Sequence, residues 1–291
     1  MPNRPADWRL VYDDVDLAFG SIRSGYVFPS APEFGSPELT NDDAARPRGD
    51  GVLFGQDTRS GTTVTFAIDV VGSGEAGVLS KLSPLAAAWR ADSIRQTPGA
   101  TATLVADTGR VTFGRPRRFA HSHAARKDGL IQVTADFATA DDLWYGDEQS
   151  ARVNLVPPSG GGLVAPLASP LSTTPTSDRS TSILVDGELP TWPVFEVAGP
   201  ITNPVIEVVG LFRLGFSLTL AYDQTLVVDT RPWARSILRN GASVAGALTS
   251  SSARLSRASI PPGSHETVLR GTSATGTASL VTRWRPAYHT A

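Results

Sequence analysis

Cysteine is absent from the 291 residues of this chain. Its absence excludes disulfide bonds, thiolate metal ligands and thiol nucleophiles together. The chain also has almost no excess of one charge, because 26 basic and 28 acidic residues leave a formal net charge of -2. Such a balance is not typical of a protein that binds nucleic acid over its whole surface. Packing and hydrogen bonding must therefore hold the fold together.

Long apolar runs are missing as well. No segment approaches the roughly 18 apolar residues that cross a membrane as a helix. The first residues, MPNRPADWRLVYDD, lack the apolar core of a signal peptide. We therefore expect that the chain has no membrane span. We also expect that it is synthesised in the cytoplasm of a cell. At 30.7 kDa and 41% hydrophobic residues, the chain is long enough for two domains with separate cores.

Residues that alternate between apolar and polar dominate the first half of the chain. This period of two is typical of half-buried β-strands. Asp107, Thr108 and Gly109 separate two such segments with residues that favour a tight turn, which predicts a hairpin. The first half is therefore predicted to be a mainly antiparallel sheet. The segments are Val64–Val70, Ala100–Asp107, Gly109–Arg115 and Leu130–Phe137.

One helix is predicted within this sheet domain, over Glu75–Arg95. Apolar residues recur there at spacings of three and four, which gives one stripe that can pack across the sheet. Pro84 indicates either a kink in the first turns or a start of the helix proper at that residue. The stripe consists of Val78, Leu82, Leu85, Ala86 and Trp89.

The middle of the chain, residues 157–182, is rich in proline, glycine, serine and threonine. A segment of this composition cannot bury enough surface to form its own core. We therefore predict a linker, or an arm that docks on another surface. Leu163, Val164 and Leu167 are the apolar side chains available for docking on a neighbouring subunit.

Alternation returns after this segment, in strands separated by glycine, proline and asparagine. This spacing predicts an antiparallel β-sandwich without a long helix. The predicted fold class is therefore mainly β, with an antiparallel β domain and one packed helix over residues 1–156 and the sandwich over residues 183–291. The strands of the second half begin near Trp192, Asn203, Phe216, Thr225, Glu266 and Ser279.

A G-x-G-x-x-G pattern at Gly72, Gly74 and Gly77 suggests nucleotide binding. A dinucleotide site requires these glycines in a βαβ unit, with a second parallel strand and an acidic residue that holds the ribose. Here the next strand forms a hairpin with its successor, and Asp92 falls inside the predicted helix. We interpret the glycines as a turn between a strand and a helix, and predict no cofactor.

His121 and His123 could share a metal ion from one face of a strand. No cysteine or nearby carboxylate completes such a site. A polar turn that also carries basic residues explains the two histidines better, and we predict no metal. These basic residues are Arg117, Arg118, Arg126 and Lys127. This basic turn is expected either to be solvated or to meet an acidic partner surface.

Three pairs of adjacent aspartates raise the question of a glycosidase, which needs two carboxyl groups across a sugar. Adjacent residues on a strand point to opposite faces, so these pairs make poor dyads, and solvated loops or turn caps explain them better. No G-x-S-x-G motif is present. We therefore predict no catalytic residues and no enzyme activity. The pairs are Asp13 and Asp14, Asp42 and Asp43, and Asp141 and Asp142.

Two short motifs have structural explanations. Arg48, Gly49 and Asp50 match an adhesion tripeptide, but in a protein made in a cytoplasm they are better explained as a turn. Trp144 and Tyr145, flanked by acids, are expected to pack in a core or an interface, with stacking on a sugar as the alternative.

The order of several weak motifs is more informative than any one of them. Gly20 to Gly25 follow an early strand, and a polar loop then ends in GDGVLFGQD. The strand TVTFAIDVVG, a helix, a hairpin and DDLWYGDE come next. The second half runs VPPSGGGLVAPLASP, PTWPVFEVAGPITNPVIEV, LVVDTRPWARSI, NGASV, IPPGSHETV and LVTRWRPAY. In this order the motifs resemble those of distal tail (Dit) proteins, or siphovirus-type minor tail proteins, of long-tailed bacteriophages, most of all actinobacterial ones.

The resemblance spans nearly the whole chain, with a departure at Asp186, Gly187 and Glu188, where an Asn-rich turn would open the second domain. It implies an N-terminal domain that forms a six-fold ring and a C-terminal galectin-like sandwich outside the ring. It also implies a virion location at the tail tip, between the tail tube protein and the hub or tail-associated protein. The tape measure protein and other minor tail proteins are further implied partners.

DNA leaving the phage head would pass through such a ring, which is the one contact with nucleic acid that we expect. A strongly positive lining would retain the phosphate backbone. The basic segment Arg115–Lys127 is therefore expected to face a protein neighbour or the outside of the ring.

The alternative function is binding of a host-envelope glycan by the sandwich, since galectin-like folds carry sugars elsewhere. Sugar rings usually stack on an exposed tryptophan or tyrosine. Trp192 and Trp233 adjoin prolines in turn-like contexts, which favours a packing role for these two residues. The candidates are Trp192, Tyr222, Trp233, Trp284 and Tyr288.

Overall fold

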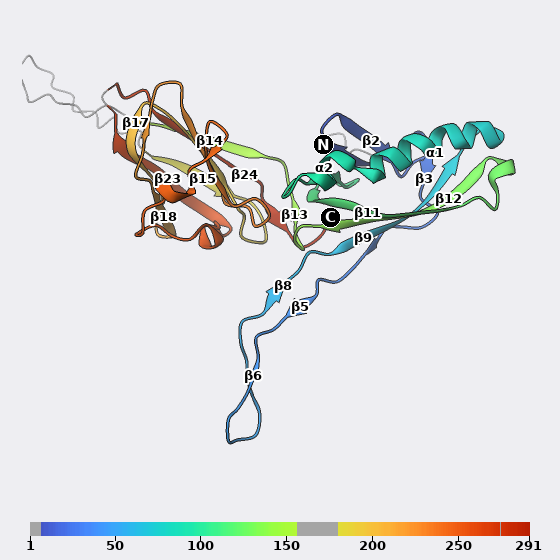
Figure 1. The fold of residues 1–291 in the computed structure, drawn as a ribbon, viewed down its shortest axis with the longest axis horizontal. Helices are drawn as coiled ribbons and strands as arrows, with labels where there is room; N and C mark the ends of the chain where they lie inside the picture. The colour runs from blue at the N-terminus through green and yellow to red at the C-terminus, as the bar shows by residue number, and fades with distance from the viewer. Residues whose placement is uncertain (1–6, 156–179, 274) are drawn as a thin grey trace, which may run out of the picture. The chain divides into compact units, whose positions relative to one another are not determined.

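A computed structural model describes residues 7–155, 180–273 and 275–291 (Figure 1). The chain forms two compact units. Unit 1 comprises Met1–Gly146 and Tyr288–Ala291, and unit 2 comprises Asp147–Ala287.

Leu163, Val164 and Leu167, the apolar residues predicted to dock on a neighbour, lie outside the described residues. In the part of the chain that the structure describes, no helix is long and apolar enough to cross a membrane.

The units differ from the predicted domains 1–156 and 183–291. Strand β14 (Gln149–Asn154), which we placed in the first domain, pairs with β24 (Ser279–Trp284) in unit 2. The last four residues return to unit 1. The prediction followed a change in composition, whereas strand pairing joins segments far apart in the sequence and leaves no local mark.

Unit 1 is built on a ten-stranded sheet with the path β2-β1-β10-β11-β12-β9-β3. Neighbours along this path are antiparallel, as predicted. The path comprises β1 (Trp8–Tyr12), β2 (Val15–Phe19), β3 (Tyr26–Val27), β9 (Thr63–Val71), β10 (Ala102–Val105), β11 (Val111–Ser122) and β12 (Leu130–Thr139), and the same sheet includes β4 (Glu33–Phe34), β13 (Trp144–Tyr145) and β25 (Ala287–Tyr288).

The predicted hairpin between β10 and β11 is confirmed. Gly109, with a φ of 88°, donates its N–H to the carbonyl oxygen of Ala106 at 2.9 Å. Ala106 in turn donates to the carbonyl oxygen of Arg110 at 2.8 Å. Glycine adopts this left-handed conformation without a steric penalty, which explains why the turn can be tight.

The predicted helix is observed as α1 (Gly74–Arg90), followed by the short α2 (Asp92–Gln96). Ala91, at a φ of 46°, ends the first helix, so the predicted range Glu75–Arg95 is divided between α1 and α2. Pro84 lies inside α1 and does not start it. Helix α1 lies along one face of the sheet (Figure 1). Its buried residues are Val78, Leu82, Leu85, Ala88 and Trp89, so Ala88 takes the place that we predicted for Ala86.

The G-x-G-x-x-G pattern connects β9 to α1, as interpreted from the sequence. Gly72 donates its N–H to the carbonyl oxygen of Gly129 at 2.9 Å. A Cβ on Gly72 would lie 2.3 Å from the backbone nitrogen of Val78. The pattern thus lets the strand and the helix approach closely, and β12, the neighbour of β9, is antiparallel to it.

Substituting Gly72 with alanine should destabilise unit 1 by about 3 kcal/mol, because the new methyl group overlaps backbone atoms that cannot move independently. Gly74 is the matched control, since a Cβ there meets nothing within 4 Å and only the φ of 70° is unfavourable. Gly74→Ala should cost about 1 kcal/mol. Urea unfolding of both variants measures the difference, and equal losses would contradict the steric explanation.

Unit 2 is a sandwich of two antiparallel sheets, as predicted. The sheets have the orders β14-β24-β16-β20-β21-β22 and β15-β23-β17-β18, with β19 paired to β17. Apolar side chains from both sheets form one core, for example Phe195 of β16 and Ile206 of β17. The further elements are β15 (Ser180–Val185), β16 (Val194–Ala198), β17 (Ile201–Val208), β18 (Phe212–Gly215), β19 (Thr219–Leu220), β20 (Thr225–Asp229), β21 (Ser236–Arg239), β22 (Ala242–Ser243), β23 (Gly263–Thr272) and the 3-10 helices η2 (Ala245–Ala247) and η3 (Leu255–Arg257).

Candidate functional site

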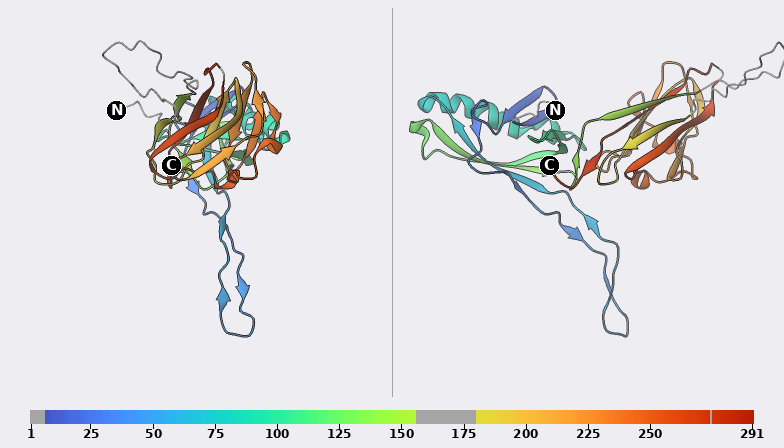
Figure 2. Two further views of the ribbon diagram at one scale, coloured as in Figure 1. Left: turned by 90° about the vertical axis from the view of Figure 1, so that its left-hand side faces the viewer. Right: turned by 180° about the vertical axis from the view of Figure 1, so that it is seen from behind.

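A long hairpin leaves the sheet of unit 1 between β4 and β9, and we call its residues 35–62 the arm. Figures 1 and 2 show it as a narrow two-stranded ribbon that extends well beyond the sheet. Two separate strand pairs hold it together. They are β5 (Leu39–Thr40) with β8 (Thr58–Arg59), and β6 (Ala44–Ala45) with β7 (Val52–Leu53).

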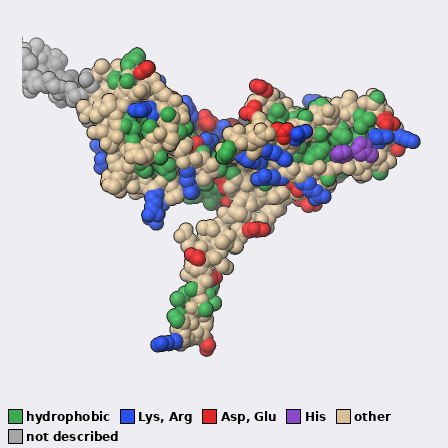
Figure 3. Space-filling view, in the orientation of Figure 1, with side chains coloured by type: hydrophobic (Ala, Val, Ile, Leu, Met, Phe, Trp, Pro, Cys, Tyr) green, Lys and Arg blue, Asp and Glu red, His purple; other side chains and the backbone are tan. Residues whose placement is uncertain are grey.

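The arm is exposed over most of its length. Every residue from Glu38 to Ser60 is exposed, including Phe54 at 88% and Leu39 at 62%. Figure 3 shows apolar side chains together on the lower part of the arm. A two-stranded ribbon alone is marginally stable in water, and exposed apolar side chains gathered in one place typically mark a protein contact. The arm is therefore the candidate functional site of unit 1.

The tip of the arm carries the tripeptide Arg48, Gly49 and Asp50. Arg48 has a φ of 66° and Gly51 a φ of 104°, which places the tripeptide in the turn between β6 and β7. The interpretation as a turn is confirmed. We described this stretch only as a polar loop, although a glycine-rich turn between two apolar pairs is a hairpin signal.

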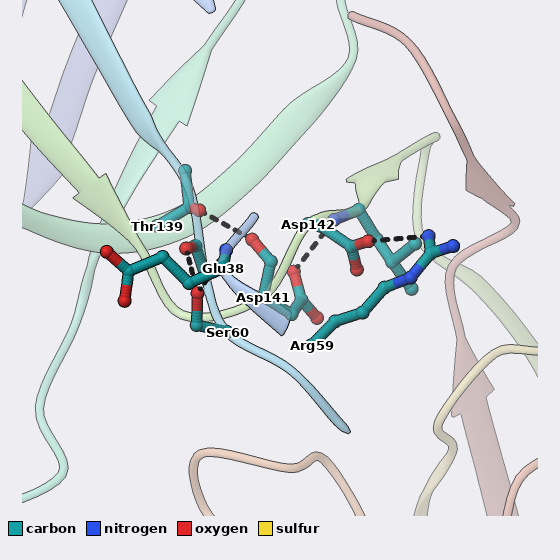
Figure 4. Close-up of polar contacts among 8 residues, drawn as sticks. Glu38, Arg59, Ser60, Thr139, Asp141 and Asp142 are labelled. Atoms are coloured by element: carbon teal, nitrogen blue, oxygen red, sulfur yellow. Dashed lines mark hydrogen bonds and ion pairs between the residues drawn. The ribbon is translucent and has the colours of Figure 1, made fainter. Parts of the chain in front are cut away.

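The base of the arm is fixed to the turn that follows β12 (Figure 4). Thr62 donates its backbone N–H to the hydroxyl of Thr139 at 2.7 Å, and that hydroxyl lies 2.5 Å from the carbonyl oxygen of Asp141. Arg59 forms an ion pair with Asp142 at 3.2 Å. These contacts hold the point at which the arm leaves the sheet.

The adjacent carboxylates Asp141 and Asp142 differ in their surroundings. Asp141 accepts hydrogen bonds from the Tyr145 hydroxyl at 2.5 Å and the Leu143 N–H at 3.2 Å, so it caps its own turn as predicted. Asp141 is half-buried, and its partial burial raises its pKa to about 6 despite these two donors. The sequence gives no sign of this burial.

Lowering the pH from 7 to 5 should stabilise the fold by roughly 1 kcal/mol through Asp141. The folded chain holds this proton more tightly than the unfolded chain, because the folded pKa of about 6 exceeds the ordinary value of 3.8. This stability is lost as the pH rises through about 6. Urea unfolding midpoints at several pH values measure this change in stability.

Asp141→Asn removes the titrating group and should flatten this part of the pH profile. Tyr145→Phe is the opposite control, since it removes a donor that lowers the pKa of Asp141. It should move the loss of stability to higher pH. An Asp141→Asn profile with the wild-type slope would show that another group is responsible.

A cavity of about 500 Å³ opens beside the base of the arm. Phe34, Arg59 and Trp144 line it together with the last three residues of the chain. Trp144 is buried and its ring lies edge-on to that of Phe34, with centroids 6.0 Å apart. The expected packing role of Trp144 is therefore confirmed.

The basic segment Arg115–Lys127 lies at the end of β11 and in the turn that follows. Arg115 donates to the carbonyl oxygens of Ala100 and Thr97 at 2.6 and 2.7 Å, so this guanidinium is structural. Arg117, Arg118 and Lys127 are exposed.

The two histidines of this segment lie close together, with ring centroids 4.8 Å apart for His121 and His123. Across the described residues, no group of three or more His, Asp or Glu side chains is placed to hold a metal ion.

Two of the five aromatic residues proposed to stack on a sugar are not placed for that role. Trp284 is buried at 6% exposure and donates its indole N–H to the carbonyl oxygen of Leu184 at 3.2 Å. Tyr288 lies in unit 1, where the guanidinium of Arg110 covers its ring at 3.8 Å. The sequence did not show this packing, because alternation along a strand does not reveal which other segments cover a side chain.

The other three aromatic residues lie in unit 2. Trp192 and Trp233 are partly buried, and the guanidinium of Arg231 lies 5.8 Å from the Trp233 ring. Tyr222 is 80% exposed. The structure therefore leaves Tyr222 as the candidate with an accessible ring.

No protein-family model and no curated protein matches this sequence. The structure is similar to that of SPP1 Dit, which is described as a paradigm of the hub adsorption apparatus in phages that infect Gram-positive bacteria. The TM-score is 0.56 at 16% identity, over 95% of this chain and 98% of SPP1 Dit. The chain has the fold of SPP1 Dit.

A second solved structure agrees. A protein of the phage P2 baseplate, solved in its activated conformation with calcium, matches with a TM-score of 0.51 at 11% identity. The match covers 95% of this chain and 97% of that one. The resemblance to distal tail proteins is thus confirmed at the level of the Dit fold, across both units.

Proposed function

We propose that this chain is a structural subunit of a phage tail tip. Six copies form a ring that joins the tail tube protein to the hub or tail-associated proteins and organises the baseplate. The observation that carries this proposal is the match to the Dit fold over 95% of this chain and 98% of SPP1 Dit. In this proposal the chain is a component of the virion, unit 1 forms the ring and the galectin-like unit 2 lies outside it.

The surface of unit 1 supports a role in assembly. The arm exposes the apolar side chains of Leu39, Val52, Leu53 and Phe54, which is a liability for a protein that stays alone in solution. A ring in which each subunit covers part of its neighbour removes exposed edges of this kind.

Light scattering on the purified chain tests the proposal. A ring of six 30.7 kDa chains has a mass of about 180 kDa. We expect this mass at micromolar concentration. A chain that remains monomeric at hundreds of micromolar, alone and mixed with the tail tube protein, would contradict the ring.

Glycan binding by unit 2 is the second candidate function, and the exposed ring of Tyr222 favours it. If this ring stacks on a sugar, Tyr222→Ala should abolish binding of the full chain to a glycan array, since stacking provides much of the affinity. Trp233→Ala is the control and should retain binding. Absence of binding by the unmodified chain at millimolar sugar removes this candidate.

A further inference from the structure

On one side of the arm, acidic residues flank a strand that has an unpaired edge. The segment Glu38–Asp43 contains three exposed carboxylates, those of Glu38, Asp42 and Asp43. Its strand, β5, pairs with β8. No other strand among the described residues pairs with β5. The edge of β5 that faces away from β8 is therefore available to another strand.

A second unpaired edge, with the opposite charge, lies at the far end of β11. Strand β10 pairs with β11 only as far as Gly114, whereas β12 continues along β11 to Ser122. The side chain of Arg95 donates to the carbonyl oxygens of Pro116 and Arg117, both at 3.0 Å. The edge is thus uncovered from Arg118 to Ser122 within the described part of the chain.

The charges beside the two edges are opposite in sign. Arg117 and Arg118 are exposed beside the β11 edge, and opposite charges on neighbouring strands attract. The edge of the same sheet at β2 is a poorer partner for an acidic strand, because Asp13 and Asp14 precede β2 and Asp16 lies in it.

We propose that segment Glu38–Asp43 of one copy adds as a strand to the Arg118–Ser122 edge of β11 in a second copy. The inference rests on the proposed function, since it names the surfaces that join neighbours in the ring. Each copy contributes one acidic and one basic edge, so the contact is head-to-tail and can close into a ring. It also places the basic segment against a protein neighbour.

Disulfide cross-linking tests this pairing without interference, because the chain has no cysteine of its own. Thr40→Cys and Ala120→Cys are combined in one chain, and Leu39→Cys with Ala120→Cys samples the opposite face of β5. We expect oxidation of at least one of the two double variants to give a ladder of cross-linked chains up to the hexamer. The control combines Thr40→Cys with Asp223→Cys, an exposed position in unit 2, and should give no ladder.

Exchange of the charges tests the electrostatic part. Glu38→Arg with Asp42→Arg should slow cross-linking at least tenfold, and so should Arg117→Glu with Arg118→Glu. Mixing the two charge variants should restore the rate, because the reversed arm then meets the reversed edge. Slowing without recovery on mixing would indicate damage to the fold and overturn the pairing by charge.

The outcomes separate this inference from the proposed function. A mass of six subunits without any cross-link means that the ring closes through other surfaces, and the inference fails alone. A cross-link at high concentration in a chain whose mass stays at two subunits upholds the pairing and removes the hexamer. If the chains form no cross-link and do not associate, both the inference and the proposed function are contradicted.

Discussion

Removal of the arm is expected to convert the proposed ring of six chains into monomers. Replacing residues 37–60 by a short glycine-rich turn deletes the exposed apolar side chains and the acidic edge together. The shortened ends can be joined, because Gly35 donates its N–H to the carbonyl oxygen of Thr63 at 2.8 Å and so holds the two stems side by side. The mass measured by light scattering should fall from that of six chains to that of one.

The fold of unit 1 should survive this deletion. None of the residues from Glu38 to Ser60 belongs to the core, since all are exposed. The urea midpoint of the deletion variant should therefore stay close to that of the full chain. A ring that persists without the arm would contradict the assembly role of this segment, whereas a lost ring with a lowered midpoint would indicate unfolding.

Truncation of Trp89 is expected to have the largest effect on stability. Its side chain is fully buried between α1 and the sheet, with ring centroids 5.5 Å from Phe19 and 6.1 Å from Phe66. Trp89→Ala should lower the free energy of unfolding by about 3–5 kcal/mol, because it removes a large apolar surface and leaves a cavity. It also removes the hydrogen bond from the indole N–H to the carbonyl oxygen of Asp136 at 3.1 Å.

Trp89→Phe separates the two contributions. It keeps a ring in the aromatic cluster and loses the hydrogen bond, so it should cost less than half of the alanine value. Urea unfolding measures both variants. Equal losses would mean that the hydrogen bond, rather than the packing, determines the stability of this site.

The periodicity of the sequence was enough to predict the class of the fold. Alternation over Val64–Val70 and Leu130–Phe137 indicated strands, and both segments lie within long strands of the sheet. Helical spacing indicated α1, and four of the five residues of its predicted stripe are buried. These features are local, because the backbone conformation of a segment decides which of its own side chains share a face.

The candidate site was much less visible in the sequence. From the sequence we predicted only a polar loop for the arm. Its strands are two residues long, which is too short for an alternation of apolar and polar residues to show a period. Trp284 and Tyr222 are both aromatic residues near strand ends, yet one is buried and the other is 80% exposed. Exposure depends on what packs above a residue, and that neighbour comes from elsewhere in the chain.

The sequence by itself determined that this protein is rich in antiparallel strands, has no disulfide bonds and turns from β9 into α1 at Gly72. The tertiary structure alone decided that β14 belongs to unit 2, that Asp141 is half-buried at the base of the arm, and that β5 and the end of β11 keep an unpaired edge. Turns and strand propensities are set by neighbours in the chain, whereas pairing and burial are set by segments brought together only on folding.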